Sequence, residues 1–365
     1  MTDAGAHSTL LSVCLSEELS RTDRDVSTIV VDGPRQGVQP LAISQTCKRT
    51  KRIMYDVTVI GSSVIDILAA PFDPDALAKG KRDVDQIRMS FGGDALNESV
   101  VLSRLGKKVQ LISKIGADEA GRSIRKHLEK EKVSTEHVIV QQGLNTSVNI
   151  ALVDAGGERK FLMDPHSSQR KLDLEDVLPM LDETAPIVSF ASIFISPCFS
   201  IEKMEKLFSV IKAAGKILVS DVTRPKNGET FEDLKVLFPY MDVFVPNDEE
   251  IFLLTGEKDP YRNVQMLVDA GVKTAVVKIG KDGSLVGTRD GITHVHAVPG
   301  IKCVDTTGAG DAFAAGFISG LIEGRSMTDC ARIGCAAASC SIEQVGATDG
   351  VRSIDQVMER CMRIL

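Results

Sequence analysis

The sequence predicts an α/β protein with a mostly parallel central sheet, flanking helices and a small second β-sheet. Short apolar runs alternate with longer amphipathic stretches from residue 55 onward, which is typical of strands joined by crossover helices. Three other segments alternate apolar and polar residues, as the strands of a half-exposed antiparallel sheet do. The 365 residues, 43% of them apolar, suffice for a core of this size.

The central sheet is predicted from its apolar runs. The first strand lies in Tyr55–Gly61, an apolar segment that ends in a glycine turn. Further strands are predicted at residues 109–115, 193–196, 216–221, 243–246 and 274–279. Amphipathic spacing predicts helices at residues 94–105, 119–131, 201–214, 247–255, 263–270, 309–323 and 327–345.

The small sheet is predicted at residues 62–72, 85–90 and 146–163, where the apolar residues recur with a period of two. A turn at 154–157 would join its last two strands. We expect this sheet to form a lid over a site on one domain that spans residues 53–365. Its exposed edges and apolar face would allow a homodimer through the lid, and a monomer is the alternative.

The first 52 residues differ from the rest, because they show no sustained period and end in a basic cluster (Lys48, Arg49, Lys51 and Arg52). They are interpreted as a flexible extension. Met54 directly precedes the first strand. We therefore expect the native chain to start at Met54, with residues 1–53 dispensable.

Composition excludes several classes of function. The net charge of −7 provides no broad basic surface for nucleic acid. No apolar run reaches the ~18 residues of a membrane span, and a secretory signal is missing at the start, so a cytoplasmic location is expected.

The eight cysteines have neither zinc-site nor disulfide spacing. Cys330, Cys335 and Cys340 fall in an alanine-rich helix and are interpreted as packing residues.

The segment Cys303–Gly316 is the most informative motif, because a strand end, a glycine turn and a helix of small residues follow one another. Gly308 and Gly310 allow main-chain N–H groups to approach an anion, and the helix N-terminus adds partial positive charge. Asp311 in the first helical turn could accept a proton from an attacking hydroxyl. In an isolated motif of this kind, Asp311 would more simply be a helix cap.

Further motifs favour the catalytic interpretation. Asp305-Thr-Thr-Gly-Ala-Gly-Asp311 resembles the signature of the ribokinase-like (PfkB) carbohydrate kinases, and Phe91-Gly-Gly-Asp-Ala-Leu-Asn97 resembles their N-terminal glycine-pair motif. The resemblance covers Tyr55 to the C-terminus and implies a ribokinase-like fold. It also implies that Gly308, Ala309, Gly310 and Asp311 carry the catalysis.

The same resemblance implies a sugar site. Asp66 would hydrogen-bond paired hydroxyls of the sugar. The other implied residues of this site are Gly92, Gly93, Asp94 and Asn97. Asp94 stands where ribokinases themselves tend to have lysine, and the segment Ser196–Phe199 lacks an expected acidic residue. These departures argue against ribose as the substrate.

The resemblance also implies a nucleotide site in the C-terminal half. Asn247-Asp-Glu-Glu250 matches an N-x-x-E motif, so Glu250 would organise Mg²⁺ through water. The remaining implied ATP-binding residues are Asn247, Lys278, Gly280, Gly283 and Thr306. Many relatives bind K⁺ through main-chain carbonyls, and the implied ligands here are Asp305, Thr307 and Gly346.

The function implied is that of an ATP-dependent carbohydrate kinase with a primary hydroxyl as acceptor. A nucleoside kinase of the adenosine or pseudouridine type is one alternative, and a catalytically silent sugar or nucleotide sensor is another. ATP and Mg²⁺ would be the cofactors, with K⁺ as a third. Sugar and ATP would be the partners, without nucleic acid or membrane.

Other motifs receive structural interpretations. Gly116–Ser123 has P-loop spacing but Arg122 in place of the essential lysine, so it is predicted to be a turn before a helix. The segment Gly308–Phe313 lacks the third glycine of a dinucleotide fingerprint. Asp221 and Arg224 are interpreted either as substrate contacts or as a loop-closing pair. The histidines expected to be surface residues without a role are His166, His294 and His296.

Overall fold

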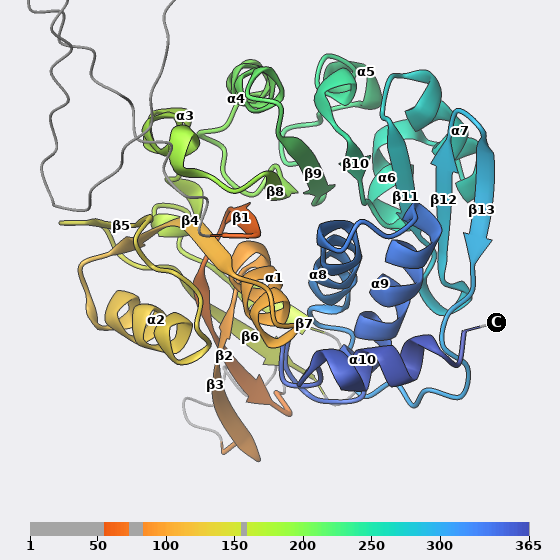
Figure 1. Ribbon diagram of the computed structural model, residues 1–365. Coiled ribbons are helices and arrows are strands. Elements are labelled where there is room, and N and C mark those ends of the chain that lie inside the picture. The colour runs from red at the N-terminus through yellow and green to blue at the C-terminus, as the bar shows by residue number, and fades with distance from the viewer. Residues whose placement is uncertain (1–54, 73–82, 155–158, 365) are drawn as a thin grey trace, which may run out of the picture. The chain divides into compact units, whose positions relative to one another are not determined.

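The structure, a computed structural model, describes residues 55–72, 83–154 and 159–364. Within these ranges nine strands form one large sheet in the order β13-β12-β11-β10-β9-β8-β1-β4-β5 (Figure 1). Neighbours from β5 to β11 run parallel, whereas β12 is antiparallel to both β11 and β13. The strands are β1 (Val57–Ile60), β4 (Val109–Gly116), β5 (Val138–Gln141), β8 (Ile187–Ile193), β9 (Ile217–Val222), β10 (Val243–Phe244), β11 (Thr274–Lys278), β12 (Ser284–Thr288) and β13 (Gly291–Val295).

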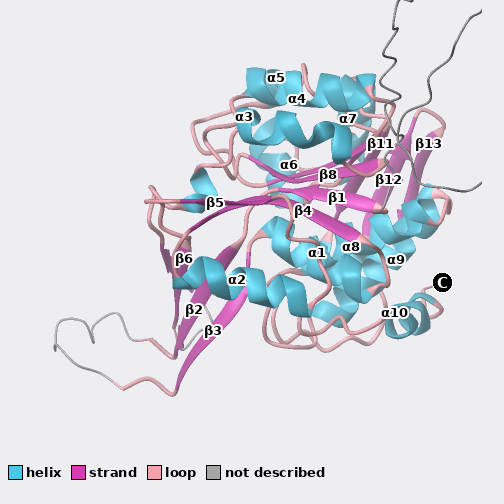
Figure 2. Ribbon diagram, turned by 60° about the vertical axis from the view of Figure 1, so that its left-hand side comes forward, coloured by secondary structure: helices cyan, strands magenta, loops and turns pink. Residues whose placement is uncertain are grey.

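Helices cover both faces of this sheet (Figure 2). One face packs against α1 (Asp94–Arg104), α2 (Glu119–Lys130), α8 (Ala309–Ile322), α9 (Met327–Ser341) and α10 (Ile354–Cys361). The opposite face packs against α3 (Leu174–Val177), α4 (Ile201–Ala213), α5 (Phe231–Leu234), α6 (Asp248–Thr255) and α7 (Pro260–Asp269). Strand β1 is buried on both sides, because Val57 and Val59 join the first core and Ile60 joins the second.

The predicted α/β architecture is confirmed, with most helix boundaries correct to within three residues. The strand predicted at 193–196 is wrong, because β8 occupies Ile187–Ile193 and the following residues form a turn. The sequence pattern also missed the β12–β13 hairpin and the helix α10. These elements pack at the end of the sheet, where antiparallel pairing replaces the crossover pattern on which the prediction relied.

The small sheet contains β2 (Val64–Ala70), β3 (Gln86–Gly92), β6 (Val148–Val153) and β7 (Arg159–Leu162) in the order β3-β2-β6-β7. Its position in the sequence agrees with the prediction, but its pairing is only partly antiparallel. The central strands β2 and β6 run parallel, so an entirely antiparallel sheet is ruled out. Most of the predicted turn at 154–157 lies outside the described residues.

Strand register separates the two faces of the small sheet. Asp66 lies opposite Ser90 on β3 and Asn149 on β6, so these polar residues share one face. The next residue, Ile67, pairs with Met89 and Ile150 and therefore belongs to the other face. We call the face of Asp66 the polar face, although it also carries Leu68, Ala151 and Phe161, and we call the other the apolar face.

The order of the large sheet reverses at β1. From β1 the chain runs outward through β4 and β5 on one side, and through β8, β9, β10 and β11 on the other. In parallel α/β sheets, ligands bind outside the carboxyl ends of strands at such a reversal. The fold thus positions a crevice beyond β1 and β8, where the loops that carry the motifs meet.

The described residues contain no helix long and apolar enough to cross a membrane. The predicted extension at residues 1–52 and the expected start at Met54 lie outside the described residues.

Candidate active site

The glycine turn before α8 has the conformation that the anion-site prediction requires. Gly308 caps the helix with φ 73° and ψ 5°, a left-handed conformation that disfavours any residue with a side chain. A Cβ at this position would also collide with the main chain of Ala347. The turn is therefore specific for glycine. It is closed by a hydrogen bond from the Ala309 N–H to the Thr306 carbonyl at 3.2 Å, and it begins the N-terminus of α8, the end of a helix that favours anions.

Asp311, in the first turn of α8, contacts Asn97 of α1. Asn97 Nδ2 donates a hydrogen bond to Asp311 Oδ2 at 2.8 Å. Burial, the nearby carboxyl of Asp94 and, more weakly, that of Asp221 raise the pKa of Asp311 to about 8, against the opposing effects of Asn97 and Lys278. The glycine-pair motif that contains Asn97 and the glycine turn that precedes Asp311 thus meet at one carboxyl group, although they are more than 200 residues apart in sequence.

Asn97 also has a free acceptor. Its side chain is 5% exposed, yet its Oδ1 has no hydrogen-bond partner among the described residues. A buried amide oxygen without a partner costs free energy, on the order of 1 to 3 kcal/mol, that a bound ligand hydroxyl would recover. The amide therefore orients Asp311 with one atom and presents an acceptor with the other.

Lys278, at the end of β11, brings a positive charge to the glycine turn. A Cβ built on Gly310 would lie 3.3 Å from Lys278 Nζ. Lys278 Nζ also forms an ion pair with Asp221 Oδ2 at 2.6 Å. Burial opposes the charge, but Asp221 and Glu250 outweigh it and raise the pKa of the ammonium group. Lys278 is thus a fixed cation.

The pairing of Asp221 settles one prediction. Arg224 does not contact Asp221 but pairs with the exposed Glu249 at 3.0 Å. The predicted loop-closing pair of Asp221 and Arg224 is therefore wrong, and Asp221 instead holds Lys278.

Asn247 and Glu250 form a reciprocal cap at the start of α6. Asn247 Oδ1 accepts from the Glu250 N–H at 2.8 Å, and Glu250 Oε2 accepts from the Asn247 N–H at 2.9 Å. Burial and the charge of Asp221 raise the pKa of Glu250 to about 7. The cap leaves Glu250 Oε1 as the carboxyl oxygen that can face a hydrated cation.

A cavity of about 1290 Å³ lies beside α8 and the loops after β10 and β11. All five residues predicted to bind ATP line it: Asn247, Lys278, Gly280, Gly283 and Thr306. Ala309 and Gly310 line it too, so this cavity reaches the predicted anion turn. Its volume is sufficient for a nucleotide.

His294 and His296 of the β13 region line the same cavity, with ring centroids 4.3 Å apart. His294 Nε2 lies 2.7 Å from the carbonyl oxygen of Asp282. His296 is exposed and His294 is partly buried, and both lie at the wall of this cavity. His166 is exposed, as expected.

Asp66 of β2 lies on the polar face of the small sheet. Asn149 Nδ2 donates to Asp66 Oδ1 at 3.0 Å. A Cβ at Gly92 would collide with Asp66 Oδ2, so a side chain there would displace the carboxyl group. Asp66 therefore lies against the main chain at Gly92, and the adjacent Gly93 caps α1.

A smaller cavity of about 60 Å³ separates this face from the loops around α8. Asp66, Asp305, Thr307 and Gly346 all line it. Asp305 Oδ1 accepts from the N–H of Thr307 at 2.9 Å and from its hydroxyl at 2.7 Å, while Oδ2 accepts from the N–H of Gly346 at 3.1 Å. The three predicted K⁺ residues are thus brought together by one carboxylate.

Asp94 begins α1 at the carboxyl ends of β8 and β9. Its side chain makes a hydrogen bond with Ser192, and burial together with nearby Asp221 raises its pKa. The structure thus brings together carboxyl groups of Asp94, Asp221, Glu250 and Asp311 near the cation Lys278. This excess of negative charge suits a site for cations or for protons.

Two residues near the site were missed. Glu98 of α1 is 2% exposed, and burial with the charges of Asp311 and Asp221 raises its pKa to about 8 against a hydrogen bond with Ser189. Its sequence signal is a lone acid in a helix that is otherwise buried from Ala95 to Leu102. Asn149 gave no signal, because its role depends on strand register.

Two structural interpretations hold. Asp118 caps α2 by accepting from the Gly121 N–H at 2.8 Å, so the P-loop-like segment is a turn before a helix. Cys330, Cys335 and Cys340 are buried in α9, and burial raises the pKa of each thiol.

Comparison with known proteins gives a consistent result. Residues 54–354 match the family described as pfkB family carbohydrate kinase. An uncharacterized sugar kinase of Archaeoglobus fulgidus is 31% identical over 268 residues, which cover 70% of this chain and 99% of that protein. An ATP-dependent 6-phosphofructokinase of Thermoanaerobacterium thermosaccharolyticum is 25% identical over 308 residues, covering 83% of this chain and 92% of that protein.

A solved structure supports the fold. Arabidopsis thaliana ribokinase, complexed with ribose and ATP, superposes with a TM-score of 0.71 at 21% identity. The match covers 84% of this chain and 98% of that one. At this identity the likeness establishes the ribokinase-like fold and leaves the substrate open.

Proposed function

We infer the function from one premise: this chain belongs to the pfkB family of carbohydrate kinases and is a sugar kinase. We propose that it transfers the γ-phosphoryl group of ATP to a hydroxyl, usually primary, of a sugar or sugar-like acceptor. Asp311 is the general base. The observation that carries this proposal is the contact between Asn97 and Asp311 beside the glycine turn of α8.

The surroundings of Asp311 raise the basicity of its carboxyl group. A carboxyl with a pKa of about 8 is a stronger base than an exposed aspartate, so it takes the proton of an attacking hydroxyl more readily. Asn97 fixes the orientation of one carboxyl oxygen. The acceptor hydroxyl would lie between the other oxygen of Asp311 and the free Oδ1 of Asn97.

The glycine turn would stabilise the negative charge that spreads over the transferring phosphoryl oxygens. The main-chain N–H groups of Gly308 and Gly310 would supply hydrogen bonds, since that of Ala309 already donates to the Thr306 carbonyl at 3.2 Å. Lys278 would supply a fixed positive charge beside Gly310. Mg²⁺, when bound, neutralises the phosphates. Glu250 would hold it through water, since one carboxyl oxygen is committed to the helix cap.

ATP would occupy the cavity of about 1290 Å³. Asn247 and Thr306 would border its phosphates, and Gly280 and Gly283, which line the same cavity, would lie against the nucleotide. A K⁺ ion would lie beside the turn, bound by main-chain carbonyls of the loops that Asp305 joins, since the carboxylate of Asp305 already accepts three hydrogen bonds.

The acceptor would bind between the carboxyl ends of the large sheet and the polar face of the small sheet, which would act as a lid. Asp66 would bind paired hydroxyls, Gly92 and Gly93 would offer bare main chain, and Asp94 and Asn97 would complete the site. Closing of the lid would exclude water and suppress ATP hydrolysis.

The apolar face of the small sheet supports a homodimer. Its side chains include Ile87, Met89 and Leu162, which are 72%, 58% and 57% exposed. Exposed apolar side chains gathered on one sheet face are typical of protein interfaces. We propose that two copies pack these faces together.

Nucleosides remain the second candidate acceptors because of Phe161. Its ring lines the small cavity next to Asp66 and is 52% exposed, so a base could stack on it. Phe91 is not available for this role, since it stacks on His127 with centroids 4.1 Å apart. A catalytically silent sensor is disfavoured, because it would not need the contact between Asn97 and Asp311.

The substitution Asp311→Asn tests the mechanism. It keeps the size of the side chain but removes the base, so turnover should fall by a factor of about 10² to 10⁴ while Mg-ATP binding stays near normal. Asp290→Asn, in the exposed turn before β13, is the matched control and should leave turnover unchanged. Full turnover in the Asp311 variant would remove it from the proposed role.

A further inference from the structure

Arg88 connects the edge of the small sheet to the segment 345–349, which follows α9. Its Nη2 forms an ion pair with Asp349 Oδ2 at 2.5 Å, and its Nη1 donates to the Val345 carbonyl at 3.4 Å. The two charged side chains are 37% and 50% exposed, so water weakens this pair without abolishing it. Strand β3 and a segment more than 250 residues further along the chain are thus joined by one side chain.

Arg88 lies on the face of the small sheet that carries Asp66. Leu68 pairs with Arg88 and Asp66 pairs with Ser90, and alternate residues of a strand share a face. Arg88, Asp66 and Gly346 also line the cavity of about 60 Å³. The arginine therefore extends from the polar face of the small sheet to the loops beside α8.

The segment 345–349 lies directly against the glycine turn before α8. A Cβ at Gly308 would collide with the carbonyl oxygen and the Cα of Ala347, so the two main chains are in direct contact. The Gly346 N–H donates to Asp305 Oδ2 at 3.1 Å, three residues before Gly308. A displacement of this segment would consequently displace the turn.

Gly346 leaves room for the ion pair. Its φ of 110° is a conformation that favours glycine. A Cβ at this position would lie 3.1 Å from Asp349 Oδ2 and 3.7 Å from Arg88 Nη2, so a side chain would press on the carboxylate that Arg88 binds. The two consecutive residues Gly346 and Ala347 therefore contact the ion pair on one side and the glycine turn on the other.

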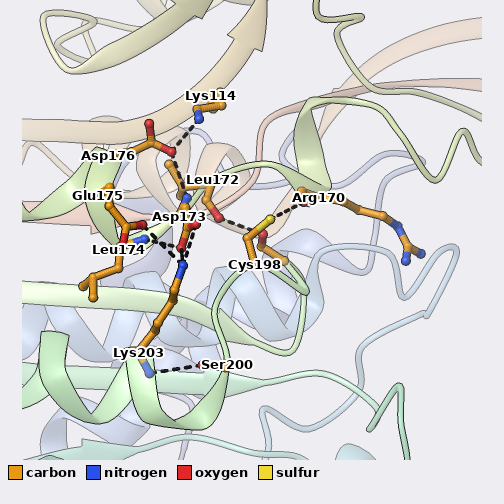
Figure 3. Close-up of polar contacts among 11 residues, drawn as sticks. Lys114, Arg170, Leu172, Asp173, Leu174, Glu175, Asp176, Cys198, Ser200 and Lys203 are labelled. Atoms are coloured by element: carbon orange, nitrogen blue, oxygen red, sulfur yellow. Dashed lines mark hydrogen bonds and ion pairs between the residues drawn. The ribbon is translucent and has the colours of Figure 1, made fainter.

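The other side of the small sheet is anchored to the large sheet. After β7, the carbonyl of Arg170 accepts from Cys198 Sγ at 3.3 Å, and Lys114 of β4 pairs with Asp176 of α3 at 2.5 Å (Figure 3). These contacts fix the chain where it leaves the small sheet. Strand β3 forms the opposite edge. The edge formed by β3 is therefore the part of the sheet whose position depends on Arg88.

We propose that Arg88 is a positioning residue, whose ion pair with Asp349 couples the lid to the glycine turn. Phosphates bound at the turn would order the edge of the lid, and an acceptor bound under the lid would order the turn. This inference rests on the proposed function, which assigns the phosphates to the turn and the acceptor to the polar face of the small sheet. Because a coupling free energy is reciprocal, each substrate would strengthen the binding of the other by the same factor.

Amide hydrogen exchange with an ATP analogue measures this coupling before the acceptor is identified. The probe is the Mg²⁺ complex of β,γ-methylene ATP, and the free protein is the reference. We expect the analogue to slow exchange at residues 306–311, at residues 345–349 and in β3. In β3 the slowing should be about three- to fivefold, which is the upper range that a partly exposed ion pair can transmit.

Variants assign the coupling to the ion pair. Arg88→Gln and Asp349→Asn each remove one partner, so exchange should still slow at residues 306–311 while the slowing in β3 shrinks to less than about 1.5-fold. Arg88→Asp combined with Asp349→Arg reverses the pair and should restore about half of the slowing in β3 or more. Arg88→Lys keeps the charge and should retain part of it.

Arg332→Gln on α9 is the matched control. It breaks an ion pair with Asp329 whose side chains are 41% and 47% exposed, close to the values of the pair in question. The slowing in β3 should be the same in this variant as in the parent chain.

The outcomes separate this inference from the proposed function. If the analogue slows exchange at residues 306–311 but not in β3 of the parent chain, or slows β3 equally in Arg88→Gln, the coupling is overturned and the kinase proposal stands. A loss that neither the reversed pair nor Arg88→Lys restores also overturns it, because Arg88 would then act through packing alone. If the analogue leaves residues 306–311 unchanged in the parent chain, both proposals fail.

Discussion

Asp311 and Glu98 illustrate how the position of a buried carboxyl group determines its role. Burial raises the pKa of both carboxyl groups to about 8. Asp311 follows Ala309 and Gly310, which line the large cavity, and it contacts Asn97, so we propose that its proton is exchanged with a substrate. Glu98 lies inside the core at 2% exposure, so its proton mainly affects stability.

The pKa of Asp311 predicts the pH dependence of activity. The base acts only when deprotonated, so kcat/KM should rise with pH, reach half its maximum near pH 8 and level off about one unit higher, in contrast to the plateau above pH 5 of an ordinary aspartate. A pH profile from 5.5 to 9 measures this limb. A constant kcat/KM over that range would contradict the assignment of the base.

Glu98→Gln should stabilise the fold at alkaline pH. Because the folded-state pKa is about 8 and the unfolded value is near 4.5, the folded protein holds an extra proton between these values. Stability therefore falls as pH rises through this window, by about 1 kcal/mol per pH unit, and the loss is complete above pH 8.

Urea unfolding at pH 5.5, 7.0 and 8.5 measures the effect. The advantage of the Gln variant over the parent chain should grow with pH and then level off. Glu202→Gln, an exposed carboxylate on α4, is the control and should give no trend. A difference that stays constant with pH would show that Glu98 is not titrating in the folded protein.

The sequence predicted those residues whose role depends on local main-chain geometry. Gly308, Gly310 and Asp311 belong to one turn, so their spacing specifies their arrangement. The ion pair between Asp221 and Lys278 joins residues 57 positions apart, and it follows from which strand ends lie close together in the sheet. No spacing in the sequence indicates such a pair.

At the scale of elements, the small sheet shows both the strength and the limit of pattern analysis. A period of two identified its strands, because one face is polar and the other apolar. The same period occurs in parallel and antiparallel strands, so it did not reveal that β2 and β6 are parallel. Direction depends on the long connection between them, which the period does not describe.

The apolar face of the small sheet predicts dimer formation. Ile87→Glu and Leu162→Glu place charges on that face and should weaken the dimer at least about tenfold, because buried unpaired charges are costly. Size-exclusion chromatography with light scattering measures the mass. Val210→Glu, a 39% exposed position on α4, is the matched control. A parent chain that is monomeric at 100 μM would contradict the dimer.

At the scale of the molecule, Lys278 connects the anion turn before α8 with the end of β9, since its Nζ lies beside Gly310 and pairs with Asp221. Mg-ATP at about 100 times its Kd should add about 2.7 kcal/mol to stability and raise Tm by about 4 °C. In Lys278→Met this ligand-induced rise should shrink to less than half. Lys206→Met is the control, and an undiminished rise in the Lys278 variant would exclude contact with the phosphates.

The reversal of strand order at β1 divides recognition along the chain. The residues proposed to bind the acceptor, from Asp66 to Asn97, precede those that line the nucleotide cavity, from Asn247 onward. Asp311, the proposed base, would serve both substrates. Exchange of the N-terminal loops would therefore change the acceptor while the ATP-binding residues stay the same. A chimera joined between Lys226 and Asn247 would make this change in one step.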